Sequence, residues 1–581
     1  MPPAETLLPG EVEWQFDALD LRPVERFIAR VQGLHSPARP GLELAARPAK
    51  RLADCYLDSA DWRIGRAGRV LRVRHSGRSF VATLKDLVDS KDGLRSRIEI
   101  EEPLAAGALP ATGDGPVTSR VRALAGSARL LPVLEVRTRR RPFILSRAGV
   151  ELGELVLDET AITAPTLRRP LRLRRVELEV LGAATSELEP FVVALREECG
   201  LQPAALSKFE AGLLAAGLEI PTPAELPAIA VTPESTLGEL AFAALRADTN
   251  EVLRREPGTR LGEDPEELHR MRVATRRLRA ALKLFAEALP VRAAHLEEEI
   301  GWLAAELGVV RDLDVQLEQL AEWSAEAAPA DEEGLAELAA ALEEARLGAR
   351  TGLLRSLDSR RYQRLVAGLR QMLAAAPPRR SARARTACAV GLPELLGGRQ
   401  LAARKAARRA RKSGAAEDFH RLRIRVKRLR YALEFSARSY GSLPKRYTRE
   451  LVGLQDELGA MQDAVTAAER LREAALSGTG ALSLGAVFAI GGLAERYRHE
   501  AERLRALVGE EARAVDGGHW KRLATALERR RNDALAAIEA AHPAPRPRAP
   551  RRPAPLARLA LLPPSAELPP EAGQGGVPLP S

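Results

Sequence analysis

The sequence is poor in the residues that characterise disulfide-bonded, zinc-binding and base-stacking proteins. It contains only three cysteines, Cys55, Cys199 and Cys388, which are odd in number and lie far apart. This spacing indicates neither a disulfide framework nor a zinc cluster and favours a reducing cytoplasm. Aromatic residues make up 4% of the chain, which argues against a surface for single-stranded nucleic acid, because such surfaces stack bases on aromatic rings.

Long apolar runs are also lacking. The most apolar stretch, residues 482–493, is too short to cross a bilayer and contains three glycines, so we expect a tightly packed helix or turn there. The opening MPPAETLLPG has neither the basic nor the apolar region of a signal peptide, which predicts a cytoplasmic protein with no membrane partner. From His542 onward the chain is rich in Pro and Arg without periodicity, which predicts a disordered tail over 542–581.

Positive charge is present in excess. The chain carries 89 Lys and Arg residues against 78 Asp and Glu, which gives a formal net charge of +11 and a pI near 9.9. This excess fits an acidic partner but does not choose between nucleic acid, anionic lipid and polyphosphate. At 581 residues the chain is too long for a single hydrophobic core, so we expect two or three domains.

The second half of the chain contains an internal repeat. The segment HRMRVATRRLRAAL begins at His269, and HRLRIRVKRLRYAL begins at His420, 151 residues later. Each is followed by the motif LG-x-x-(R/Q)-D, which begins at Leu307 and again, 151 residues later, at Leu458. A repeat that stays in register over this distance predicts a duplicated helical unit.

Each repeated segment has one basic and one apolar face when it is drawn as a helix. The basic faces comprise His269, Arg272, Arg276, Arg279 and Lys283 in the first copy and His420, Arg423, Lys427 and Arg430 in the second. Neither segment contains an acid that would relieve the repulsion, so we expect a partner rich in phosphate, for which arginine forks are well suited. The alternative is a basic face that contacts only solvent, with histidines that pack or cap rather than bind phosphate.

The first half of the chain shows short segments in which apolar and charged residues alternate, from about residue 11 to 180. Charged pairs two residues apart share one face of their strands, with apolar residues on the other face; they are Glu11 with Glu13, Arg72 with Arg74, Glu99 with Glu101, and Glu177 with Glu179. This pattern predicts an antiparallel sheet or closed barrel. If the apolar face packs outward against helices, the charged face lines a lumen, where a divalent metal and phosphate would bridge acids and arginines. The alternative is that the charged face contacts water and its residues pair across strands.

The ordered motifs EVEWQF, YLDS, LRVR, TLK, RSRIEIE, LVLD, VELEV and SKFE resemble those of the CYTH family, the triphosphate tunnel metalloenzymes, over residues 9–218. The resemblance implies an eight-stranded antiparallel tunnel that binds triphosphate-type substrates with Mg²⁺ or Mn²⁺. It implies a metal site formed by Glu11, Glu13, Glu177, Glu179 and Asp158, phosphate contacts from Arg72, Arg74, Lys85, Arg97, Arg139 and Lys208, and catalytic roles for Glu11, Glu13 and Lys85. The roles of Glu99, Glu101 and Arg140 stay open.

One residue departs from the CYTH pattern. The family has lysine at the last position of its opening motif, and this chain has Gln15. A neutral amide donates hydrogen bonds but does not offset phosphate charge. Two hypotheses therefore remain for the tunnel, a metal-dependent inorganic triphosphatase and a degenerate tunnel that only binds phosphate.

Residues 236–541 resemble the CHAD family, the conserved-histidine α-helical domain, on the repeated histidines, arginines and LG-x-x-(R/Q)-D motifs. Residues 219–235 form the expected linker, and the two repeats are expected at about 236–390 and 391–541. The whole chain is thus predicted as a multidomain α+β protein in which a β-tunnel precedes a duplicated, all-α helical bundle. The resemblance implies binding of inorganic polyphosphate at a basic central surface, with a cytoplasmic or granule-associated location. A non-catalytic scaffold on polyphosphate granules is the alternative, and nucleic acid is the disfavoured partner.

Overall fold

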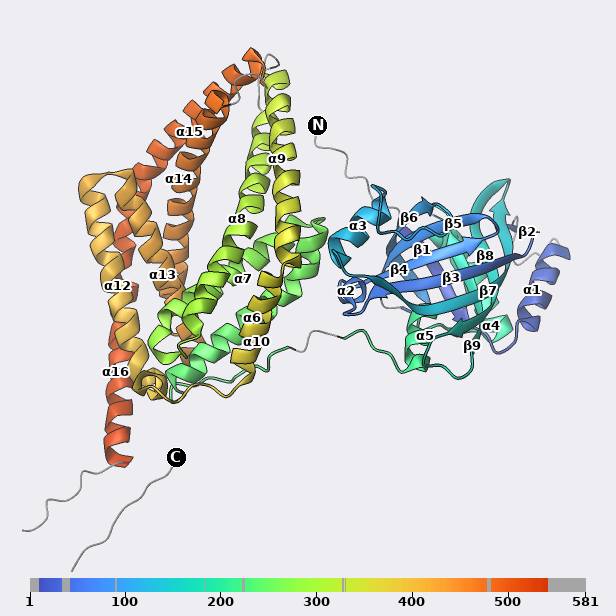
Figure 1. The fold of residues 1–581 in the computed structure, drawn as a ribbon, viewed down its shortest axis with the longest axis horizontal. Coiled ribbons are helices and arrows are strands. Elements are labelled where there is room, and N and C mark those ends of the chain that lie inside the picture. The colour runs from blue at the N-terminus through green and yellow to red at the C-terminus, as the bar shows by residue number, and fades with distance from the viewer. Residues whose placement is uncertain are drawn as a thin grey trace, which may run out of the picture.

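The computed structural model describes residues 10–33, 42–88, 91–182, 184–221, 225–325, 329, 331–477 and 482–541. A β-barrel domain comes first, and a long helical domain follows it (Figure 1). The predicted tail at 542–581 lies outside the described residues. Within the described part of the chain, no helix has the length and apolar character needed to cross a membrane.

Eight strands form the barrel, and every pair of neighbours in it is antiparallel. They are β1 (Gly10–Asp17), β3 (Lys50–Ser59), β4 (Arg69–Ser76), β5 (Ser79–Asp86), β6 (Leu94–Leu104), β7 (Leu130–Arg147), β8 (Val150–Thr163) and β9 (Leu171–Val180). The order around the barrel is β1, β6, β5, β4, β3, β7, β8, β9, and pairing of β9 with β1 closes it. Two short strands, β2 (Leu42–Ala46) and β10 (Gln202–Pro203), pair with β7 and β1. The predicted closed barrel is confirmed.

The apolar sides of the strands face outward, where helices cover them. Helices α1 (Arg22–Gly33) and α4 (Thr185–Cys199) pack in one cluster with Val176 and Leu178 of β9. Helices α2 (Arg63–Arg66) and α3 (Pro116–Ala125) pack in another with Leu71 of β4 and Ile100 of β6. All four strand residues are at most 6% exposed. Because the apolar side is outside, the charged side must line the interior, as the alternation predicts.

Helix α5 (Lys208–Ala216) closes one part of the barrel interior. Its Phe209 and Leu213 pack with Leu134 and Val136, which belong to β7. A methyl group added at Gly212 of this helix would lie 2.6 Å from Leu134 Cδ1, so only glycine allows this close approach. The packing of α5 brings Lys208, at its first turn, to the charged interior.

The helical domain repeats one arrangement. Its first part consists of α6 (Leu237–Leu261), α7 (Pro265–Leu284), η1 (Ala286–Ala288), α8 (Ala293–Ser324), α9 (Glu332–Asp358), α10 (Arg360–Ala374) and α11 (Ala382–Arg385). Its second part consists of α12 (Cys388–Ser413), α13 (Ala416–Tyr440), α14 (Lys445–Ser477), α15 (Leu484–Glu511), η2 (Ala512–Asp516) and α16 (Gly518–Ala541). The order α6 to α9 recurs in α12 to α15 at the offset of the sequence repeat, which confirms the duplication.

The two parts contact each other at both ends. Helices α7 and α13, which carry the repeated basic segments, pack against one another, and the tips of α9 and α15 meet at the far end (Figure 1). The predicted packing faces are correct. In α7, Met271, Thr275 and Leu278 are at most 1% exposed, and in α13, Leu422 and Val426 are fully buried. The opposite, basic faces of these helices are therefore left for the surface.

The barrel and the helical domain contact each other through α3 and the end of α6. Leu261 packs against the apolar cluster beneath α2 and α3. The next turn contributes Glu263, whose carboxylate pairs with Arg69 of β4 at 3.1 Å and with Arg120 of α3 at 2.5 Å. These contacts join the wall of the barrel to the turn that precedes the basic helix α7.

Candidate functional site

A cavity of about 410 Å³ occupies the barrel interior. Its wall carries six basic and eight acidic side chains. The basic ones are Arg72, Arg74, Lys85, Arg97, Arg140 and Lys208, and the acidic ones are Glu13, Asp54, Asp86, Glu99, Glu101, Glu154, Glu177 and Glu179. The lining thus has more acids than bases although the whole chain is basic.

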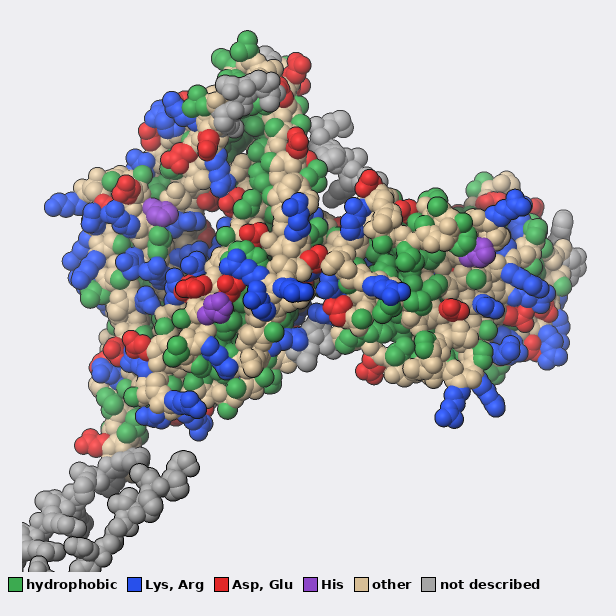
Figure 2. Space-filling model, viewed as in Figure 1, with side chains coloured by type: hydrophobic (Ala, Val, Ile, Leu, Met, Phe, Trp, Pro, Cys, Tyr) green, Lys and Arg blue, Asp and Glu red, His purple; other side chains and the backbone are tan. Residues whose placement is uncertain are grey.

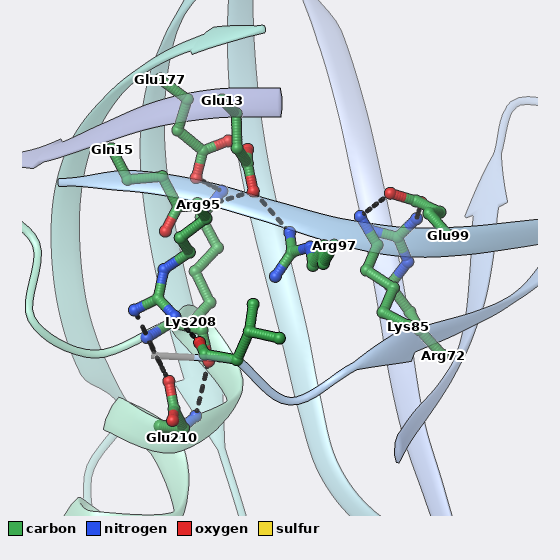
Figure 3. A network of polar contacts seen from close by, with 12 residues as sticks. Glu13, Gln15, Arg72, Lys85, Arg95, Arg97, Glu99, Glu177, Lys208 and Glu210 are labelled. Atoms are coloured by element: carbon green, nitrogen blue, oxygen red, sulfur yellow. Dashed lines mark hydrogen bonds and ion pairs between the residues drawn. The ribbon is translucent and has the colours of Figure 1, made fainter. Parts of the chain in front are cut away.

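Each of the six basic side chains forms an ion pair with an acid of the barrel interior. The pairs join Arg72 and Lys85 with Glu99, Arg74 with Asp54, Arg97 with Glu13, and Arg140 and Lys208 with both Asp158 and Glu177. Figure 3 shows Arg97 pointing at Glu13, and Lys85 and Arg72 pointing at Glu99. The interior of the barrel thus combines paired charges of both signs.

Two of the acids and two of the bases form one cluster, Asp158 and Glu177 with Arg140 and Lys208. Asp158 is fully buried, and it accepts hydrogen bonds from Arg140 at 2.7 Å and Lys208 at 2.5 Å. Burial opposes ionisation of Glu177, but Lys208 and Arg140 outweigh it and hold the pKa of this carboxyl well below its usual range. Burial likewise opposes the charge on Lys208, yet Glu177 and Asp158 raise its pKa above the usual value. Glu177, Lys208 and Arg140, whose pKa these acids also raise, are thus charged at neutral pH.

A row of three carboxylates crosses three neighbouring strands. In the strand register, Glu13 of β1 lies opposite Glu179 of β9, and Glu179 lies opposite Glu154 of β8. All three line the cavity. Like charges directly opposite one another on a sheet destabilise it unless a counter-charge is near. Arg97 supplies such a counter-charge to Glu13, and a bound cation would add another for the row.

Gln15 lies beside this row. Its Nε2 donates a hydrogen bond of 2.8 Å to Glu13 Oε1, while its own buried Oε1 has no hydrogen-bond partner among the described residues. An unpaired acceptor next to three carboxylates gives an oxygen-only donor set, which is the type that Mg²⁺ and Mn²⁺ prefer. No three of the described His, Cys, Asp and Glu side chains form a preassembled metal group. The residues fit a hard cation by chemistry and register.

The helical domain contains a second charged site. A hollow of about 670 Å³ is lined by α7, α8, α12 and α13. Seven Lys and Arg side chains line it, and none of its described lining residues is acidic; the seven are Arg272, Arg276, Arg279, Lys283, Arg399, Lys427 and Arg428. Figure 2 shows Lys and Arg side chains gathered over the helices that Figure 1 labels α12 and α13.

Three basic residues of this hollow have acidic partners from α8. Arg279 and Lys283 both pair with Glu297, at 2.7 and 3.3 Å, and Arg272 pairs with Asp312 at 3.3 Å. The α8 backbone also comes close to one of these arginines. A methyl group added at Gly301 would lie 3.3 Å from Arg279 Cζ. In the repeated LG motif, one added at Gly308 would lie 3.7 Å from Arg272 Nε, which is an ordinary van der Waals distance.

The other four basic residues of the hollow have no such partners. Within the described ranges, no acid forms an ion pair with Arg276, Arg399, Lys427 or Arg428. Burial, together with the positive charges of Arg276 and Arg423, lowers the pKa of Lys427 to about 7. Burial is the larger cause, and the arginine contribution reflects how closely positive charges lie around Lys427.

Two family models match the chain, one for each half. Residues 39–212 match the CYTH domain and residues 243–472 match the CHAD domain. The chain is a CYTH domain followed by a CHAD domain. None of the curated proteins compared with this chain matches it.

Solved structures similar to the chain fall into the same two groups. The CHAD domain from the plant Ricinus communis is 32% identical, with 49% of this chain and 96% of that chain covered and a TM-score of 0.41. PptA from Streptomyces chartreusis is 23% identical, covers 48% and 99%, and has a TM-score of 0.40. HpAC1 from Hippeastrum, described with a dominant triphosphatase activity, is 14% identical, covers 37% and 99%, and has a TM-score of 0.26. Because these TM-scores are low, the assignment rests on the family models.

In the CYTH domain the structure brings most of the predicted residues to one cavity. The predicted residues that line it are Glu13, Arg72, Arg74, Lys85, Arg97, Glu177, Glu179 and Lys208. Asp158 does not line it but lies beneath, paired with Arg140 and Lys208. The side chain of Glu11 lies outside the described residues, although its strand does not. The roles of all these residues stay predictions.

The predicted placement of Arg139 in the tunnel is wrong. Its side chain is 64% exposed on the outside of the barrel, where it pairs with Glu159 at 3.3 Å. Arg140 occupies the cavity instead. Successive strand residues point to opposite faces, and the chain has three arginines in a row at 139–141, so the side of each depends on a one-residue register.

Three acids of the cavity, Glu154, Asp54 and Asp86, were not predicted from the sequence, and strand alternation could have identified the first two. Glu154 lies four residues before Asp158 on β8, so strand parity places both on the inner side. Asp54 lies two residues before Tyr56, which also lines the cavity. The signal was therefore present in the alternation of each strand, without a charged pair to draw attention to it.

The CHAD hollow contains five of the nine predicted residues, namely Arg272, Arg276, Arg279, Lys283 and Lys427. The other four, His269, His420, Arg423 and Arg430, do not line it. His420 Nδ1 lies 3.0 Å from Gln462 Oε1, and Arg430 pairs with Glu434 at 3.4 Å. Burial lowers the pKa of His269 below its usual value, so this ring is neutral at pH 7. The helical wheel of one segment did not identify Arg399 and Arg428, which reach the hollow from α12 and the side of α13.

Proposed function

We propose that the CYTH tunnel binds and hydrolyses inorganic triphosphate-class substrates with Mg²⁺ or Mn²⁺, and that the CHAD hollow binds inorganic polyphosphate. The observation that carries this proposal is the contrast between the two linings. The tunnel has six bases against eight acids, whereas the hollow has seven bases and no acid. A phosphate chain therefore needs an added cation in the first site and none in the second.

In the tunnel, Glu13, Glu154 and Glu179 would hold the cation, with Gln15 Oε1 beside them. Enzymes of the CYTH family generally use divalent cations, which withdraw charge from phosphoryl oxygens when bound. Arg97, Arg140 and Lys208 line the same cavity, and their N–H groups would hold a phosphate chain in line for attack by water. Their present acidic partners fix their positions before substrate binds.

A non-catalytic tunnel is the second candidate, and one observation favours it. All six basic residues of the tunnel are already paired with acids, and the lysine of the family motif is replaced by Gln15. A tunnel of this kind binds phosphate only weakly and turns none over. Phosphate release from tripolyphosphate with Mg²⁺ or Mn²⁺ separates the two candidates, because the wild-type protein releases phosphate only if the first is correct.

Changing Gln15→Lys is expected to lower the KM for tripolyphosphate by about tenfold, because an ammonium group adds one charged contact to phosphate. The measurement is steady-state phosphate release by the wild type, Gln15→Lys and the uncharged control Gln15→Met. If the wild type is inert and Gln15→Lys is active, the scaffold function is correct for this chain. If Gln15→Lys only loses activity, Gln15 is not a weakened substitute for the motif lysine.

Polyphosphate binding is expected to weaken by up to about tenfold between pH 6 and pH 8, because one lysine loses its proton over this range. The pKa of Lys427 is about 7 in the free protein, and a bound polyanion favours the charged form. Binding therefore takes up a proton near neutral pH and becomes weaker as the pH rises. Calorimetry in buffers of different ionisation enthalpy measures this uptake. Lys427→Arg, which stays charged, should bind equally well at both pH values.

A further inference from the structure

The outer wall of the barrel has a basic groove that neither the tunnel nor the CHAD hollow includes. It has a volume of about 650 Å³ and lies on β3, β7, β8 and β9. Five arginines and one glutamate carry its charge; they are Arg51, Arg137, Arg139, Arg172, Arg174 and Glu159.

The strand register explains why these residues form a groove. Arg51, Arg139, Glu159 and Arg174 lie opposite one another in one row across the four strands. The next row contains Ala53, Arg137, Ala161 and Arg172 in the same order. The two alanines leave space between arginines, and the rows lie about 7 Å apart because they are two residues apart along each strand.

Most of the charge in this groove has no acidic partner. Arg139 pairs with Glu159, but no acid of the described ranges pairs with Arg51, Arg137 or Arg172. The helices of the barrel cover other parts of the wall, where α1 and α4 form one apolar cluster and α2 and α3 another. All five arginines are exposed. This part of the sheet thus presents an uncompensated positive surface.

We propose that this outer groove is a second polyphosphate-binding surface, separate from the tunnel and the CHAD hollow. The inference rests on the polyphosphate binding proposed above. Arginine forks bind phosphate oxygens in pairs, and the rows span four strands, about 14 Å, so an extended chain contacts several arginines at once. A single phosphate ion contacts only one or two of them.

An extended chain without bases fits this groove better than nucleic acid does. His75, at the edge of the groove, is its one aromatic-like ring among the described lining residues. That ring already stacks on Phe80, with the ring centroids 4.4 Å apart and the planes 15° from parallel. This contact occupies one face of the ring, and the described lining includes no Phe, Tyr or Trp on which bases would stack. The groove therefore suits phosphate better than bases.

Two arginines of the second row allow a sharp test. The full chain with Arg276→Glu, Lys427→Glu and Arg428→Glu removes the CHAD contribution and leaves a weaker, salt-sensitive binding of long-chain polyphosphate. Adding Arg137→Glu and Arg172→Glu is expected to weaken that residual binding by at least about tenfold. Adding Arg26→Glu and Arg129→Glu, two exposed arginines elsewhere on the barrel domain, should leave it unchanged.

Each other outcome has a defined meaning. If the CHAD variant retains no polyphosphate, or if the groove change leaves its residual binding intact, the groove is not a polyphosphate site while the proposed function stands. If the wild type itself retains no polyphosphate, the proposed function fails. If the groove holds duplex DNA or anionic lipid vesicles more tightly than polyphosphate, the assigned partner is wrong. Circular dichroism of each variant checks that the fold is intact.

Discussion

Changing both Glu13→Gln and Glu179→Gln is expected to reduce phosphate release from tripolyphosphate by at least about 100-fold, as removal of cation ligands and of charge at a reacting centre does. These two residues lie opposite each other on β1 and β9, in the carboxylate row. Glutamine keeps their size while it removes two of the eight acids that line the tunnel. The affinity for Mn²⁺, measured without substrate, should fall in parallel.

The matched control for this change is Glu189→Gln with Glu197→Gln, two exposed glutamates on α4. It alters the net charge of the chain equally and should leave both turnover and Mn²⁺ affinity unchanged. Wild-type turnover in the tunnel double variant would show that the carboxylate row does not hold the cation. Retained Mn²⁺ affinity with lost turnover would assign the two glutamates to substrate positioning instead.

Reversing three unpaired charges of the CHAD hollow is expected to weaken polyphosphate binding by at least about 100-fold. The changes are Arg276→Glu, Lys427→Glu and Arg428→Glu. Each of these residues lies in the hollow without an ion pair to a described acid. Their reversal therefore breaks no ion pair of the folded protein, and it replaces three attractive contacts with three repulsive ones. Equilibrium binding of long-chain polyphosphate at fixed salt measures the effect.

The control variant for this reversal is Arg355→Glu, Arg360→Glu and Arg364→Glu. These arginines are exposed on α9 and α10 and form no ion pair with a described residue. They carry the same change in net charge, so long-range attraction falls equally in both variants. Equal loss of polyphosphate binding in the two would mean that the hollow provides no more than the general positive charge of the chain.

The architecture of both domains follows from local patterns that a sequence displays directly. Strand alternation puts Leu71 and Val176 on the outside of the barrel, and the helical period buries Met271 and Leu422. These assignments need only a period of two or 3.6 residues and the hydrophobic effect. The repeat between His269 and His420 likewise requires no tertiary information.

The parts of the sites that were not predicted depend on register and on distant segments. Arg139 and Arg140 are adjacent, so a shift of one residue decides which of them lies inside the barrel. The basic face of α7 contains no acid, yet Glu297 and Asp312 of α8 neutralise part of it. Only the packing of α8 on α7 reveals which arginines remain unpaired.

Chelation of divalent cations is the most direct test, because we expect phosphate chains to need a bound cation in the tunnel and none in the CHAD hollow. The same protein preparation is measured with Mg²⁺ and with excess EDTA, for phosphate release from tripolyphosphate and for retention of long-chain polyphosphate. We expect EDTA to abolish phosphate release from tripolyphosphate and to leave polyphosphate retention intact. Phosphate release that continues in EDTA would show that the tunnel needs no cation. Loss of polyphosphate retention in EDTA would show that the CHAD hollow needs one.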